Sequence, residues 1–172
     1  MRKPLLLSIT VASVLVLAFT ATALAAPSHR TIQILDNCDG PTFSAVLGEG
    51  ACENESGMSF ETFFGKLFTG GAQSWRFSPE RAKVATGGAV TAVNRGGEFH
   101  TFTEVAEFGG GCVPEINEAM GLEAVPECGD PSLFGTTGVP PGASVTTPPI
   151  DAGPNLFQCL IHPWQRTTVS GT

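Results

Sequence analysis

Short hydrophobic runs separated by glycine and proline make up most of the sequence after residue 75. Residues 78–79, 87–88 and 96–97 are Ser-Pro or Gly-Gly pairs, which are typical turn signals between such runs. Short strands at close spacing with turns between them are typical of a β-sandwich. The pattern therefore predicts an all-β fold. The predicted strands are residues 31–35, 75–77, 82–85, 89–93, 100–105, 156–160 and 166–169.

Residues 60–68 follow a different pattern, in which large apolar residues recur every three or four positions. Ser59 is suited to cap the N-terminus of a helix, and Gly70 and Gly71 follow its end. The pattern predicts one short amphipathic helix that packs against the sheet. A face for a partner protein is the alternative. The apolar positions are Phe60, Phe63, Phe64, Leu67 and Phe68.

Residues 108–153 are rich in glycine, proline, threonine and acidic residues and lack a clear periodicity. We expect this segment to be mostly loop. A connection of this length in a compact domain is usually functional or held covalently. Cys112 and Cys128 lie within it and offer a disulfide.

The first 25 residues have the organisation of a secretory signal peptide. Arg2 and Lys3 precede an apolar core over residues 5–19, and residues 23–25 form a small-residue cleavage site. The apolar run is short for a retained membrane anchor. We therefore expect a secreted or periplasmic protein that begins near Ala26. The predicted parts are the signal peptide (1–25), an N-terminal extension with a strand, a disulfide loop and the helix, packed on the main domain (26–71), and that domain (72–172).

Acidic residues outnumber basic residues by 16 to 9, which gives a net charge of −7. Removal of the leader, with Arg2 and Lys3 and no acidic residue, changes the charge to −9. The absence of a basic cluster in the sequence disfavours nucleic acid and anionic membrane as partners and favours a basic protein. A solubilising role for the acidic charge is the alternative.

The chemistry is concentrated in residues 157–165, near the end of the chain. Cys159, His162 and Gln165 follow one another at intervals of three residues, between two predicted strands. His100, at the start of another predicted strand, offers a further nitrogen ligand. Two histidines, one cysteine and a weak axial group form the ligand set of a blue-copper site. Zinc is the competing metal, although structural zinc sites usually contain more cysteine.

This arrangement resembles the cupredoxins, of the amicyanin and plastocyanin type, and the local match is the amicyanin-type loop Cys-x-x-His-Pro-aromatic-Met. Gln165 stands where that methionine is expected, and Asn94 and Arg95 precede His100 as in the family. The resemblance covers residues 75–169 and does not cover 26–71. It implies a cupredoxin-like Greek-key β-sandwich, to which the N-terminal extension adds one short amphipathic helix.

The resemblance also implies a role for each residue of the site. His100, Cys159 and His162 become the equatorial ligands of one type 1 copper ion, and Gln165 takes the axial place. Asn94 becomes a residue that orients the ligand loop by hydrogen bonds, with an ordinary turn residue as the alternative. Pro163 and Trp164 become a docking rim, with a packing role for Trp164 as the alternative.

Five cysteines occur, and export implies an oxidising compartment in which cysteines pair. With Cys159 assigned to copper, four cysteines remain and allow three pairings, between which the sequence does not decide. Their short separations favour two local bridges. These bridges are Cys38 with Cys52, and Cys112 with Cys128.

The resulting functional hypothesis is an exported type 1 copper protein that transfers single electrons to a redox partner protein and is not an enzyme. Multicopper enzymes need further centres built mostly from histidine, and the sequence has only three histidines. The alternatives are a copper-carrying or storage protein, and a metal-free cupredoxin-like interaction module.

Overall fold

The computed structural model describes residues 26–172. The predicted signal peptide, residues 1–25, lies outside the described residues. Within residues 26–172, no helix has both the length and the apolar character needed to cross a membrane.

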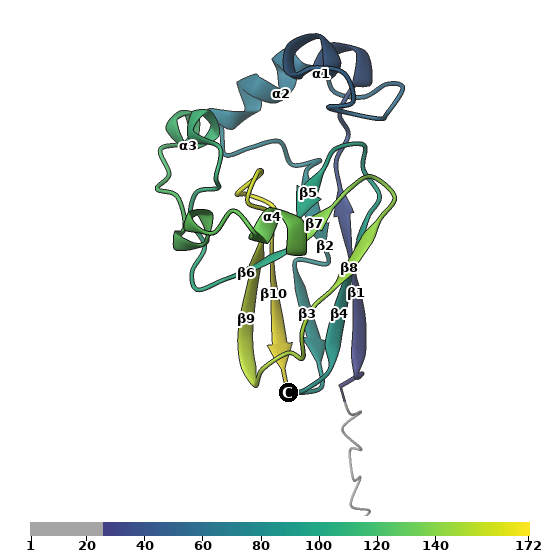
Figure 1. Cartoon of the computed structure of the whole chain (residues 1–172), viewed down its shortest axis with the longest axis vertical. Helices are drawn as coiled ribbons and strands as arrows, with labels where there is room; N and C mark the ends of the chain where they lie inside the picture. Colours follow the sequence, from purple (N-terminus) through teal and green to yellow (C-terminus); the bar gives the residue numbers. More distant parts are fainter. Residues whose placement is uncertain (1–25) are drawn as a thin grey trace, which may run out of the picture.

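Two four-stranded sheets form a sandwich, which confirms the predicted all-β Greek-key class (Figure 1). The first sheet has the order β2-β1-β4-β8 and the second has the order β3-β10-β9-β6. The strands of the first sheet are β1 (His29–Leu35), β2 (Arg76–Ser78), β4 (Ala89–Asn94) and β8 (Ser144–Thr146). The strands of the second sheet are β3 (Arg81–Val84), β6 (Thr103–Val105), β9 (Gly153–Gln158) and β10 (Arg166–Gly171). A separate pair joins β5 (His100–Thr101) to β7 (Gly138–Val139).

Strand β1 is an interior strand of the first sheet. It runs parallel to β4, with Ile32 opposite Ala92, and antiparallel to β2, with Ile34 opposite Phe77. The predicted division of the chain between residues 71 and 72 stays a prediction. The structure does show that a strand from the N-terminal side of this division is built into the sandwich.

The main core lies between the two sheets. Alternation along β4 directs Val90, Ala92 and Asn94 inward, as expected for a strand with one buried face. Within this core the rings of Phe102 and Phe157 stack, with their centroids 4.5 Å apart, and Phe77 from the first sheet contacts Phe102 at 5.2 Å. Burial of these side chains supplies the hydrophobic stabilisation of the sandwich.

Helices α1 (Gly40–Leu47) and α2 (Phe60–Leu67) lie at one end of the sandwich, opposite the end that carries the C-terminus (Figure 1). Helix α2 was predicted, and its N-cap Ser59 accepts a hydrogen bond from the backbone N–H of Thr62. Its apolar face is only partly covered, because Phe63 is buried whereas Phe64 and Phe68 are exposed. The expectation that this helix packs against the sheet was wrong, because α2 packs mainly against α1 and α3 (Pro114–Met120).

Helix α1 is an addition to the single helix predicted for residues 26–71. Its N-cap Asp39 accepts a hydrogen bond from the backbone N–H of Thr42, and a proline stands in its first turn. Asp39, Gly40 and Pro41 have the composition of a turn. The same residue types also begin helices, because proline needs no N–H there and aspartate caps the free donors.

Residues 108–153 contain more regular structure than expected. They hold helix α3 (Pro114–Met120), the 3₁₀ turn η1 (Pro126–Gly129) and helix α4 (Leu133–Thr136), as well as β7 and β8. Elements of two to seven residues are too short to show a hydrophobic period, so the sequence does not indicate them, although more than half of this segment lies outside them.

The local cysteine pairing is confirmed. Disulfides join Cys38 to Cys52 and Cys112 to Cys128, and Cys159 is a free, buried cysteine. The first disulfide ties the segment after β1 to the segment after α1. A second core cluster surrounds it and includes Phe43, Phe63 and Trp75.

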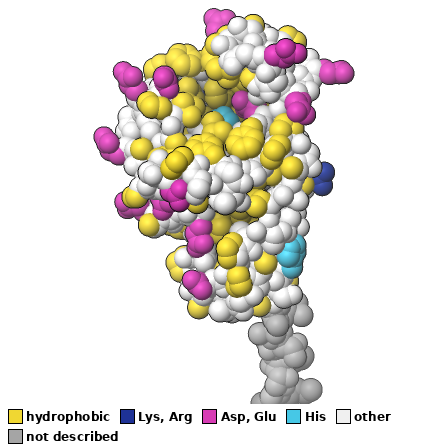
Figure 2. Space-filling view, viewed as in Figure 1, with side chains coloured by type: hydrophobic (Ala, Val, Ile, Leu, Met, Phe, Trp, Pro, Cys, Tyr) yellow, Lys and Arg dark blue, Asp and Glu magenta, His cyan; other side chains and the backbone are white. Residues whose placement is uncertain are grey.

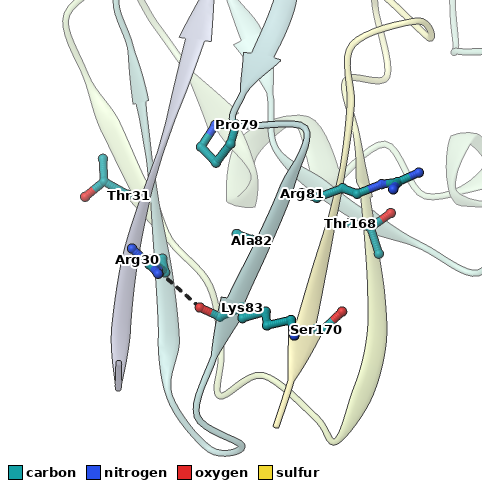
Figure 3. Close-up of a pocket in the computed structure, with 8 residues that line it drawn as sticks. All are labelled: Arg30, Thr31, Pro79, Arg81, Ala82, Lys83, Thr168 and Ser170. Atoms are coloured by element: carbon teal, nitrogen blue, oxygen red, sulfur yellow. Dashed lines mark hydrogen bonds between the residues drawn. The ribbon is translucent and has the colours of Figure 1, made fainter. Parts of the chain in front are cut away.

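Charge is unevenly distributed over the surface. Acidic side chains predominate on the face shown in Figure 2, in agreement with the net charge of −7. Three basic side chains instead line a cavity of about 730 Å³ along β1 and β3 (Figure 3). There Arg30 donates a hydrogen bond to the backbone oxygen of Lys83, and Arg81 lies beside Thr168.

Replacing Phe63 by alanine tests how the helical end is held. Phe63 is 4% exposed and its ring lies 5.3 Å from that of Phe43 and 4.8 Å from that of Trp75. We expect Phe63→Ala to lower the free energy of unfolding by about 3–5 kcal/mol, because it leaves a cavity. The measurement is urea unfolding followed by circular dichroism.

Phe64→Ala is the matched control, since Phe64 is the next residue of α2 and is 43% exposed. We expect it to lower the free energy of unfolding by about 0.5 kcal/mol or less. Equal losses for the two variants would contradict the packing of α2 through Phe63.

Candidate metal centre

Three side chains with metal-binding atoms meet at the helical end of the sandwich. The Sγ of Cys159 lies 3.8 Å from the Nδ1 of His100 and 3.8 Å from the Nδ1 of His162. The two Nδ1 atoms are 3.2 Å apart. His100 and Cys159 are fully buried and His162 is 3% exposed. The structure thus brings together three of the four predicted ligands from positions up to 62 residues apart.

The spacing of these atoms fits a single metal ion. Bonds of about 2.0 Å to imidazole and about 2.3 Å to thiolate, spread at about 120°, separate sulfur from nitrogen by ~3.7 Å and the two nitrogens by ~3.5 Å. The observed separations are 3.8, 3.8 and 3.2 Å. The residues therefore satisfy the geometric requirement for a trigonal set of two nitrogens and one sulfur.

The loop that carries Cys159 and His162 connects two antiparallel strands. Strands β9 and β10 pair up to Gln158 opposite Arg166, and the seven residues between these two form the loop. Within it, the backbone N–H of Cys159 donates to the oxygen of Gln165, and the N–H of Gln165 donates to the oxygen of His162. These bonds fix the backbone from which both ligands project.

Gln165 is fully buried at the end of this loop. Its Nε2 donates a hydrogen bond of 3.0 Å to the backbone oxygen of Leu35, the last residue of β1. Its Oε1 has no hydrogen-bond partner among the described residues. A buried acceptor without a partner is costly, so the unpaired Oε1 is suited to accept a ligand such as a metal ion.

Thr101 connects the two segments that carry the ligands. Its backbone N–H lies 3.4 Å from the Sγ of Cys159, and its Oγ1 accepts a hydrogen bond of 2.8 Å from the N–H of Leu160. Strand β5 and the β9–β10 loop are therefore held together next to the sulfur.

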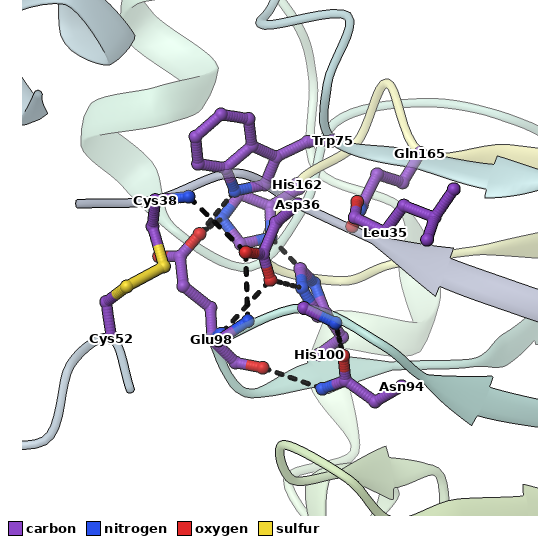
Figure 4. A network of polar contacts seen from close by, with 12 residues as sticks. Leu35, Asp36, Cys38, Cys52, Trp75, Asn94, Glu98, His100, His162 and Gln165 are labelled. Carbon is purple, nitrogen blue, oxygen red and sulfur yellow. Dashed lines mark hydrogen bonds and ion pairs between the residues drawn. A yellow bond between two sulfur atoms is a disulfide. The ribbon is translucent and has the colours of Figure 1, made fainter. Parts of the chain in front are cut away.

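Asp36 orients His100 through the ring nitrogen opposite the one that faces Cys159, and Figure 4 shows its hydrogen bond with His100. The Nε2 of His100 donates to the Oδ2 of Asp36 at 2.9 Å, which leaves the Nδ1 lone pair free to bind a metal. The backbone N–H groups of Gly97 and Glu98 also donate to this carboxylate. Although burial alone raises the pKa of Asp36, the hydrogen bonds from His100, Gly97 and Glu98 lower it to about 2.

A second carboxylate lies beside His162. The Oε2 of Glu98 is 3.7 Å from the Nε2 of His162 and accepts a hydrogen bond from the indole N–H of Trp75 (Figure 4). Burial raises the pKa of Glu98 and outweighs the opposing effects of His162 and Trp75. Each imidazole thus has a carboxylate on the side opposite its Nδ1.

The contacts of Cys159 favour its thiolate form. Burial alone raises the pKa of the thiol, but the hydrogen bonds with His100 and His162 and the charge of both rings hold it well below its usual range. Burial likewise lowers the pKa of His100, whereas its hydrogen bonds with Asp36 and Cys159 raise it to about 9. The thiolate is the form of cysteine that binds metals.

Asn94 holds the turn that leads to His100. Its Nδ2 donates to the backbone oxygens of Glu98 and Val139, at 2.7 and 2.9 Å, and its Oδ1 accepts from the N–H of Gly96. Two of these bonds stay within the segment that precedes His100, and the third reaches Val139 in β7. They do not involve the loop of Cys159.

Other parts of the chain cover much of Pro163 and Trp164. Pro163 is buried and Trp164 is half-buried. The indole N–H of Trp164 donates to the oxygen of Ala72, and its ring lies 6.0 Å from that of Phe63. Because α2 packs here, Phe63 also approaches His162, with ring centroids 6.1 Å apart.

Reasoning from the sequence missed three residues of the site: Asp36, Glu98 and Thr101. Asp36 lies in a segment with the composition of a turn, 64 residues from His100, and nothing local indicates the contact. Glu98 and Thr101 flank His100 closely in sequence. Their proximity to a predicted ligand was the one available signal.

Among known proteins, this chain is similar only to solved structures. No family model and no curated protein matches the sequence. A purple cupredoxin from Nitrosopumilus maritimus is similar at 18% identity, over 59% of this chain and 86% of that chain, with a TM-score of 0.41. A mutant fern plastocyanin is similar at 12% identity, over 83% and 99% of the two chains, with a TM-score of 0.41. A mutant amicyanin is similar at 20% identity, over 59% and 76%, with a TM-score of 0.37. Because these TM-scores lie below 0.5, we base the function on the residues of the site.

Thr101→Val tests the link between the two ligand segments. Valine has the shape of threonine but cannot accept the hydrogen bond from Leu160. We expect the variant to lose about 1–3 kcal/mol of unfolding free energy, because a buried N–H is left unpaired. We also expect faster hydrogen exchange at the Leu160 amide, measured by NMR.

Thr101→Ser is the control, since it keeps the hydroxyl and removes one methyl group. We expect the Leu160 amide to remain protected in this variant. Equal protection in the valine and serine variants would show that Thr101 does not hold the loop.

Proposed function

We propose that this protein is an exported type 1 copper protein that carries single electrons. The observation that supports it most directly is the convergence of Cys159 Sγ with the Nδ1 atoms of His100 and His162 at 3.2–3.8 Å. Two imidazoles and one thiolate suit both oxidation states of copper. Zinc is less favoured, because the set contains a single cysteine.

His100, Cys159 and His162 would hold the copper, and Gln165 would offer its Oε1 as a fourth donor. When bound, copper supplies a centre that accepts and releases one electron. The chain positions the ligands in advance through contacts that already exist in the fold. Asp36 holds the tautomer of His100, and Thr101 directs its N–H toward the sulfur.

The fold also contributes by burying the side chains of the site. The side chains of His100, Cys159 and Gln165 are fully buried, so water has little access to the thiolate. Rigid ligands in a dry site reduce the rearrangement that accompanies a change of charge. Asn94 supports this rigidity through its bonds to Glu98 and Val139.

The expected compartment and partner follow from the disulfides and the charge. Two disulfides are typical of exported proteins. The net charge of −7 favours a basic redox partner, whose approach it would accelerate at low ionic strength. The proposed role is transfer of electrons to this partner, with no substrate chemistry at the site.

A copper-carrying or storage function is the second candidate, and the covering of His162 favours it. This side chain is 3% exposed and lies beneath Phe63 and Trp164. Such covering slows contact with partners and would help to retain a metal. The two functions differ in redox behaviour, since a carrier of electrons cycles reversibly without losing copper.

Cys159→Ser tests the copper site. The wild-type protein with Cu(II) is expected to show an intense visible absorption band from charge transfer between thiolate and copper. The variant is expected to lack the band and to fold normally, because the serine hydroxyl has nearly the shape of the thiol. Absorption and electron paramagnetic resonance spectra measure the first effect, and circular dichroism the second.

Wild-type protein that stays colourless and retains no copper would contradict the proposal and favour a metal-free interaction module. A colourless wild type that binds zinc one-to-one would favour the structural zinc site.

Gln165→Met tests the axial position. A carbonyl oxygen is a harder donor than a thioether and favours Cu(II), so the variant should have a higher reduction potential and keep its visible band. A rise of about 59 mV would equal a tenfold change in the one-electron equilibrium. Cyclic voltammetry of both proteins at one pH measures it. An unchanged potential would show that Gln165 does not reach the metal.

A further inference from the structure

A mostly apolar pocket of about 510 Å³ opens between α1, α2 and α3, next to His162. Its volume lies within the range of about 300–1,000 Å³ that is usual for sites of small molecules. Its walls include Val46, Leu47, Phe63, Phe64 and Ile116. Figure 2 shows hydrophobic side chains gathered over the helical end of the molecule, with a histidine and an acidic side chain visible between them.

Two buried polar side chains, Glu98 and His162, line the pocket among these apolar groups. Glu98 is 6% exposed, so its carboxyl group is more than nine-tenths buried. Its Oε2 accepts from Trp75, but no hydrogen bond reaches its Oε1 within the described residues. This oxygen retains some contact with solvent, and losing that contact is costly unless a ligand supplies a hydrogen bond in its place. Glu98 therefore points to a ligand that carries a hydrogen-bond donor.

We propose that this pocket binds a small aromatic molecule with a hydroxyl group, of the phenol or naphthol class. Its ring would pack against Phe63 and Phe64, and its hydroxyl would donate a hydrogen bond to Glu98. The contacts needed for binding are present without a metal. The inference is therefore independent of the proposed copper function.

The lining of the pocket disfavours anionic ligands and purely apolar ligands. Glu98 and Glu115 line the pocket, and no lysine or arginine does. These carboxylates would repel an anionic ligand, whereas a ligand hydroxyl could donate a hydrogen bond to Glu98. A purely apolar ligand would leave Glu98 unsatisfied. Aromatic rings also gain from contact with other rings.

The test is isothermal titration calorimetry of the purified protein, without added metal, using two probes. We expect 2-naphthol to bind one-to-one and more tightly than 2-methylnaphthalene, which has a similar shape but no hydroxyl. Glu98→Gln should weaken the binding of 2-naphthol about tenfold, as expected for one hydrogen bond to a charged group. It should leave the binding of 2-methylnaphthalene unchanged.

Phe64→Ala and Phe68→Ala form a matched pair that does not depend on Glu98. Both side chains are exposed at neighbouring turns, but Phe64 lines the pocket and Phe68 does not. We expect Phe64→Ala to weaken the binding of both probes about tenfold, and Phe68→Ala to have no effect. Thermal unfolding checks that all variants are folded.

Three results would overturn the proposal. One is the absence of saturable binding of 2-naphthol by the wild type. Another is equal weakening by the two phenylalanine variants, which would show that the probe adheres to the exposed surface. The third is a dimer in sedimentation velocity that Phe64→Ala abolishes, since a second copy of the chain would then occupy the pocket.

Discussion

The contact between strand β5 and the β9–β10 loop is the constraint on which the site depends. Thr101 makes this contact twice, through its N–H to the sulfur of Cys159 and through its hydroxyl to the N–H of Leu160. His100 precedes Thr101 and His162 follows Leu160 by two residues, so the contact determines how closely the two imidazoles approach. The register of β9 with β10, which pairs Gln158 with Arg166, then determines the loop itself.

The segment between β1 and β2 covers the site and changes its surroundings. Asp36 leaves the end of β1 to reach His100, and the disulfide between Cys38 and Cys52 holds the chain that follows. Helix α2 places Phe63 over His162. The same helices that shield the imidazole also enclose the apolar pocket beside it. Access to His162 therefore depends on residues that lie outside the sequence pattern of the ligand loop.

Carboxylates on both sides give the site its electrostatic character. Asp36 accepts a hydrogen bond from His100, and Glu98 lies near His162, so each ring faces a negative or acidic group opposite its Nδ1. Such partners orient a histidine ligand and increase its basicity. The Cys159 thiolate and the Asp36 carboxylate place negative charge beside the two imidazoles, which favours a bound cation.

By itself, the sequence determined the strands of the two sheets except β8, helix α2 and the residue types of the ligand set. Turn signals and apolar runs are local, and the spacing of Cys159, His162 and Gln165 is local as well. Local patterns could not reveal helix α1, whose start has the composition of a turn, or the short elements of residues 108–153. They also could not reveal that Asp36 and Thr101 contact the ligands, or that α2 leaves Phe64 and Phe68 exposed. Only the tertiary structure decided these points. They depend on contacts between strands and helices that are far apart in the sequence, and the spacing of residues along the chain does not indicate such contacts.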